Sequence, residues 1–134
     1  MTTALFAGLY PARGKAVAIA SGDYHTADPS TVNVNCKGAV SLRVAIDVTA
    51  ISGAGCTATV TISGINDDAS ATTYTLLSKA VTTSGVTELI VDPRVGSSAG
   101  HIDQEPLPEL IQIAVVGSGT KTTLAYSVEV EVGA

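Results

Sequence analysis

The chain has 134 residues, a formal net charge of −5, 46% hydrophobic residues and only 14% charged residues. This length suits a single domain that can bury a core without disulfides or a metal. The seven basic residues are scattered, which argues against nucleic-acid binding because such proteins concentrate Lys and Arg. No apolar run approaches the roughly 20 residues of a membrane span, and residues 1–20 lack a signal-peptide pattern. We therefore expect synthesis in a cytoplasm and no membrane contact.

The first twelve residues form an apolar stretch that follows no regular pattern. It contains Leu5, Phe6, Leu9 and Tyr10. Two interpretations stand side by side: the segment covers an open end or edge of the domain, or it docks into a neighbouring subunit or lattice. The expected organisation is an N-terminal arm over 1–12 and one domain over 13–134.

Eight segments follow that are predicted to be strands, because apolar and polar residues alternate in them and Thr and Val are frequent. The clearest is the last, where Leu124 to Val132 alternate with residues that include Glu129 and Glu131. No segment has the spacing of a long helix. The predicted strands are 14–20, 31–35, 39–49, 56–64, 72–78, 86–92, 110–116 and 123–132.

Short turn signals at 52–55, 66–68, 83–85 and 117–120 separate several of these strands. Turns of this length predict antiparallel neighbours, with 117–120 closing a hairpin between the last two strands. The predicted fold is all-β: an antiparallel β-sandwich of about eight strands, jelly-roll or immunoglobulin-like, without a long helix.

A long connection over 93–109 interrupts this plan, and connections of such length are often functional. Together with the arm it is a candidate contact element, with Arg94, His101 and Glu105 as its candidate partner-binding residues. His101 has Ser97, Ser98 and Asp103 close in sequence, yet there is no nucleophile elbow that would support a hydrolase.

The remaining chemistry is sparse. The carboxylates Asp103, Glu105 and Glu109 are better explained as solvated loop charges than as a glycosidase pair. A turn accounts for 66–68 without calcium, and the group of Asp23, His25 and Asp28 is weak as a metal site. We predict no catalytic residues, no metal and no cofactor, so the protein is not expected to be an enzyme.

Two further features bear on partners. Cys36 and Cys56 match no zinc motif, and free thiols are favoured over a disulfide. A carbohydrate-binding module is an alternative on fold alone, although Trp is absent. The low share of charged residues, against about 25% in ordinary soluble domains, favours a subunit that assembles with others.

Two stretches carry a resemblance: AVSLRVAIDVTAISGAGCTATVTISG at 39–64 and LPELIQIAVVGSGTKTTLAYSVEVEV at 107–132. Together they resemble small β-sandwich virion proteins of tailed bacteriophages. The resemblance implies a non-enzymatic head decoration (cement) protein that binds the outer surface of the major capsid protein lattice and stabilises it. It implies a homo-oligomer, with a trimer favoured, and synthesis in the host bacterial cytoplasm. A tail-associated structural protein is the alternative within the same resemblance.

Overall fold

The computed structural model describes residues 4–5, 14–26, 30–66, 72–94, 96, 102–104 and 106–133. Every regular element within these residues is a β-strand. None of them is a helix long and apolar enough to cross a bilayer. The strands are β1 (Ala4–Leu5), β2 (Gly14–Asp23), β3 (Ser30–Asn35), β4 (Ser41–Ser52), β5 (Thr57–Ile65), β6 (Thr73–Val81), β7 (Gly85–Val91), β8 (Ile102–Asp103), β9 (Leu110–Ser118) and β10 (Thr123–Gly133).

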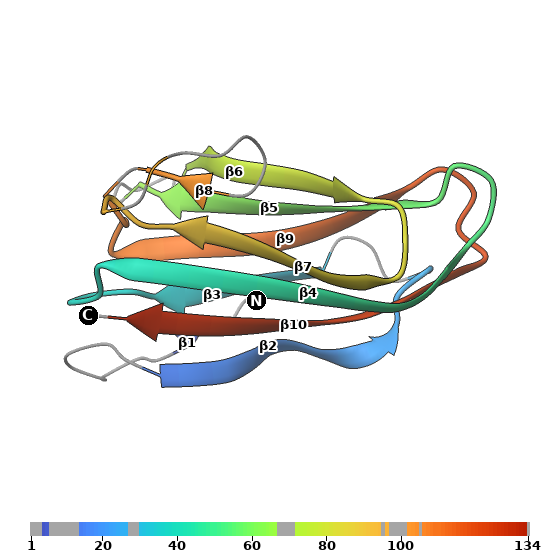
Figure 1. The fold of residues 1–134 in the computed structure, drawn as a ribbon, viewed down its shortest axis with the longest axis horizontal. Helices are drawn as coiled ribbons and strands as arrows, with labels where there is room; N and C mark the ends of the chain where they lie inside the picture. The colour runs from blue at the N-terminus through green and yellow to red at the C-terminus, as the bar shows by residue number, and fades with distance from the viewer. Residues whose placement is uncertain are drawn as a thin grey trace.

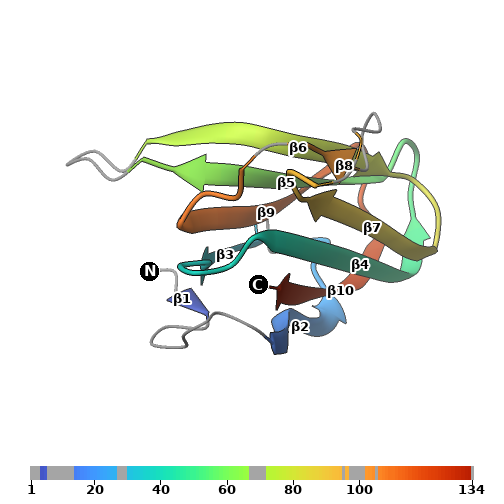
Figure 2. The ribbon, with the colours of Figure 1, turned by 60° about the vertical axis from the view of Figure 1, so that its left-hand side comes forward.

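The strands form two sheets that pack face to face (Figures 1 and 2). Sheet A has the order β1-β3-β9-β5-β6, and sheet B has the order β2-β10-β4-β7-β8. The eight longer strands pair as nested antiparallel partners: β5 with β6, β4 with β7, β3 with β9, and β2 with β10. This nesting across two sheets is the topology of a jelly roll. The predicted β-sandwich is confirmed, and of its two variants the topology is the jelly roll.

Alternation along the strands builds the core. On β4, Leu42, Val44, Ile46 and Val48 are buried, and the intervening residues face solvent. The same period of two runs through β9 and β10, because successive side chains of a strand point to opposite faces of its sheet. Each Val, Leu or Ile buried in this way stabilises the fold by about 1.5–3 kcal/mol. The inward faces of both sheets therefore form one continuous hydrophobic core.

The connections differ from the sequence prediction. The hairpin expected at 117–120 is wrong, since β9 lies in sheet A and β10 in sheet B. The turns at 52–55 and 83–85 likewise join strands of different sheets, so their strands are not paired neighbours. Only the turn that starts at Asn66 joins a hairpin, with the Asn66 N–H donating to the Thr72 carbonyl at 2.8 Å. A turn signal marks a reversal of the chain but does not say whether it stays in one sheet.

Two of the connections between the sheets pack against each other. In the link from β9 to β10, the Thr120 N–H donates to the Ala54 carbonyl of the link from β4 to β5, at 2.9 Å. Gly53 and Gly119 have φ of 119° and 76°, which favours glycine. A Cβ on Gly53 would lie 1.8 Å from the Thr120 carbonyl oxygen, and one on Gly119 would lie 2.1 Å from that of Gly55. Glycine is therefore required at this crossing.

Two short strands cover one edge of each sheet. β1 pairs in parallel with β3, with Ala4 opposite Asn33 and Leu5 opposite Val34. β8 pairs in parallel with β7, with Ile102 opposite Ile90. The pairing of Ala4 and Leu5 with β3 corresponds to the interpretation in which the arm covers an edge of the domain. A covered edge offers fewer unpaired backbone groups to other chains.

Candidate functional site

Most of the partner-binding residues proposed from the sequence cannot be placed. Phe6, Leu9, Tyr10, His101 and Glu105 lie outside the described residues. Leu5 is described through its backbone pairing in β1 alone. Of the long connection over 93–109, the structure describes residues 93, 94, 96, 102–104 and 106–109, which include β8.

Arg94 is the one candidate whose side chain is described, and it folds back onto Asp92. Its Nε and terminal nitrogen donate to the two carboxylate oxygens of Asp92, both at 3.0 Å, and its backbone N–H donates at 2.8 Å. These hydrogen bonds lower the pKa of Asp92, which is buried at the end of β7. The Arg94 side chain stays 57% exposed. It is a fixed, accessible cation at the start of the connection.

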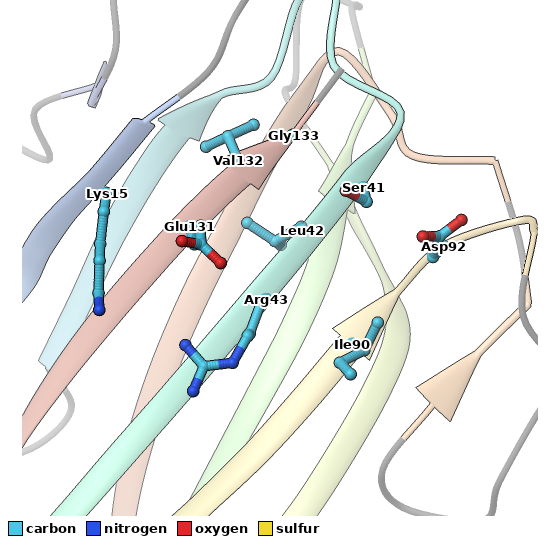
Figure 3. Close-up of a pocket in the computed structure, with 9 residues that line it drawn as sticks. All are labelled: Lys15, Ser41, Leu42, Arg43, Ile90, Asp92, Glu131, Val132 and Gly133. Carbon is cyan, nitrogen blue, oxygen red and sulfur yellow. The ribbon is translucent and has the colours of Figure 1, made fainter.

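The outer face of sheet B carries a hollow of about 510 Å³ over β2, β10, β4 and β7 (Figure 3). Neighbouring strands place Lys15 opposite Glu131, Glu131 opposite Arg43, and Arg43 opposite Ile90. These four side chains therefore form one row across the sheet. We call this cavity the outer hollow. It is lined by Lys15, Ser41, Leu42, Arg43, Ile90, Asp92, Glu131, Val132 and Gly133.

Both cations of the row are held by carboxylates one row further along the strands. The Lys15 ammonium lies 2.8 Å from Glu129, which raises the pKa of Lys15. Arg43 donates to both oxygens of Glu88, at 3.0 and 2.8 Å, which raises the pKa of Arg43 and lowers that of Glu88. Ion pairs as exposed as these contribute little to stability, because solvent screens the charges. Their main effect is to fix the positions of the two cations.

The two outer faces of the sandwich differ sharply in charge. On sheet B, the outward side chains of the strands include six charged ones: Lys15, Arg43, Asp47, Glu88, Glu129 and Glu131. On sheet A, none of the described outward side chains is charged. That uncharged face consists of small polar and aliphatic residues, among them Thr31, Asn33, Thr59, Thr61, Ser78, Ala80, Gln112, Ala114 and Val116.

Sequence reasoning missed the row on sheet B. Alternation places Arg43, Glu129 and Glu131 on outward faces of their strands. Their meeting with Lys15 depends on β10 lying between β2 and β4. That strand order follows from the nested topology and has no local signal in the sequence.

Asp23 accepts the Leu124 N–H at 3.1 Å and lies 2.9 Å from the His25 ring; Asp28 lies outside the described residues. The described part of the chain holds no group of three or more His, Cys, Asp or Glu side chains placed for a metal. Cys36 and Cys56 are free and buried, and burial raises the pKa of Cys36 to about 12.

Comparison with known proteins adds no relative. No protein-family model, curated protein or solved structure matches this chain.

Proposed function

We propose that the protein is a structural virion protein that binds the outer surface of a bacteriophage capsid and reinforces it. The observation that carries the proposal is the difference between the two outer faces of the jelly roll. A face of Thr, Ser, Ala and Val can be buried against protein without removing charges from water, which would be costly. A face with six charges is suited to remain hydrated.

In this arrangement the uncharged face of sheet A lies against the capsid lattice and sheet B faces outward. The jelly roll is common among viral capsid and lectin domains, which is compatible with the proposal, although a fold does not define a function. The resemblance of 39–64 and 107–132 to phage decoration proteins supports the same class of protein. Binding that requires the assembled lattice stabilises the shell by mass action.

A pair of matched variants tests which face binds. Thr59 and Ala45 both point outward from central strands, Thr59 on sheet A and Ala45 on sheet B. Thr59→Lys should weaken cosedimentation with undecorated capsids by at least about tenfold, because burying one unpaired charge costs several kcal/mol. Ala45→Lys should bind as the unchanged protein does. Equal binding by both variants would contradict the proposed orientation.

Counting copies per purified virion separates the head from the tail. Hundreds of copies, in simple ratio to the major capsid protein, are expected of a decoration protein. A count of a few tens or fewer would favour the tail-associated alternative, and absence from virions would contradict both.

A further inference from the structure

The outer hollow keeps hydrogen-bonding capacity that the fold does not use. Arg43 donates two hydrogen bonds to Glu88, and Lys15 uses one N–H group for Glu129. Both side chains have further N–H donors. Glu131 lies between them (Figure 3). Within the described residues its carboxylate accepts no hydrogen bond. The hollow therefore presents donor, acceptor and donor groups side by side.

The charges of the lining select against an ionic ligand. The lining carries two cations, Lys15 and Arg43, and two carboxylates, Asp92 and Glu131. The cations are paired with Glu129 and Glu88 outside the lining, and Asp92 is paired with Arg94. An anion entering the hollow would meet Glu131, and a cation would meet Lys15 and Arg43. Like charges brought together in this way are repelled. A neutral ligand meets neither obstacle.

We propose that the outer hollow binds a neutral saccharide. Sugar hydroxyls both donate and accept, so one ring can accept from Arg43 or Lys15 and donate to Glu131 without disturbing either ion pair. The volume of about 510 Å³ lies in the range of roughly 300–1,000 Å³ that is usual for small-ligand sites. This site does not depend on the capsid proposal, because it lies on sheet B.

Ile90 supplies apolar surface for such a ligand. It is partly exposed at the end of the row, next to Arg43, whereas Leu42 and Val132 beneath the hollow are buried. The aliphatic C–H groups of a sugar ring can pack on it. No aromatic residue lines the hollow, so the apolar contact is small. We expect weak binding, with a dissociation constant on the order of 1 mM.

The test is a titration of the ¹⁵N-labelled full chain, followed by NMR. The probes are the neutral methyl glycosides of glucose, galactose, mannose and N-acetylglucosamine, compared with glucuronate as an anion and glucosamine as a cation. At least one neutral glycoside should shift the backbone amide signals of Arg43, Ile90 and Glu131. The two charged sugars should shift them less at the same concentration.

Two variants on the same sheet locate the effect. Glu131→Ala removes the central acceptor and should weaken binding by at least about fivefold, the equivalent of one hydrogen bond. Asp47→Ala removes an outward carboxylate of β4 that does not line the hollow, and should stay within about twofold of the unchanged protein. The proposal is overturned if no neutral glycoside shifts these signals up to about 50 mM, which is well above the expected constant. Tighter binding of a charged sugar, or equal binding by Glu131→Ala, would also overturn it.

Discussion

Single residues decide whether the two links between the sheets can cross. Gly53 combines a positive φ with a backbone oxygen where its Cβ would lie. Gly55, two residues later in the same link, also has a positive φ of 68°, but a Cβ there would meet nothing within 4 Å. The chain thus offers two glycines of positive φ in different surroundings, and the φ of Gly53 lies further from the left-handed helical value of about 57° than that of Gly55.

Replacing each of them by alanine separates backbone strain from steric overlap. Gly55→Ala should lower the free energy of unfolding by about 1–2 kcal/mol, the cost of a left-handed residue with a side chain. Gly53→Ala should lower it by about 3 kcal/mol or more, because overpacking adds about 1–3 kcal/mol to the strain. Urea unfolding measures both. Equal losses would contradict the close contact with Thr120.

At the scale of strands, the sequence predicts positions far better than partners. All eight predicted strands occur, with ends that differ from the structure by no more than a few residues. Alternation of apolar and polar residues is a local property, so it can be read along the chain. Pairing is not local: β10 lies between β2 and β4, which are distant from it in sequence.

This difference explains why the hairpin at 117–120 was wrong and why the row through Lys15, Glu131 and Arg43 was missed. Both depend on which strands are neighbours. The candidate contacts chosen from the sequence came from the arm and the long connection, and Arg94 is the one whose side chain is described.

The Asp23 carboxylate at the end of β2 accepts a hydrogen bond from β10, and the stability that this hydrogen bond provides should depend on pH. This carboxylate accepts the Leu124 N–H at 3.1 Å and the His25 N–H at 3.1 Å, which lowers the pKa of Asp23. Because the pKa of Asp23 is lower in the folded state than the ordinary aspartate value of about 3.9, the ionised carboxylate stabilises the fold at pH values above about 3.9. This stabilisation is lost as the pH falls through the pKa of the folded state.

Asp23→Asn should therefore destabilise the protein near neutral pH and make its stability fall less steeply in acid. The measurement is the free energy of unfolding in urea at a series of pH values. Asp47→Asn, which removes a carboxylate without hydrogen bonds to the described residues, should keep the acid slope of the unchanged protein. An unchanged slope for Asp23→Asn would contradict the role of this contact.

For the whole molecule, the question is how a sandwich of open sheets avoids uncontrolled pairing with other chains. β1 and β8 cover one edge of each sheet, which leaves β2 and β6 at the other edges. The pairing of β2 with β10 contains two register irregularities. On β6, Lys79 lies opposite Val60, in the register of inward-facing residues. Bulges and inward charges are recognised protections of edge strands.

Lys79→Val should remove the protection of β6 and promote self-association. Valine at this position continues the apolar side of the strand and leaves its free edge open to another copy. Size-exclusion chromatography with light scattering should show a concentration-dependent increase in mass over the unchanged protein. Lys37→Val, in the turn after β3, is the matched control and should leave the mass unchanged. An identical mass for Lys79→Val would show that the charge is not what protects this edge.

The nested pairing also brings the beginning and the end of the rolled chain together. Gly14 at the start of β2 lies directly opposite Val132 near the end of β10. A short linker could thus join these strands, and new termini could be opened in the exposed link at 82–84. Such a circular permutant would lack β1 but would keep every strand pair from β2 to β10, while changing the order in which the strands are synthesised. A peptide fused to its new ends would leave from the opposite end of the sandwich.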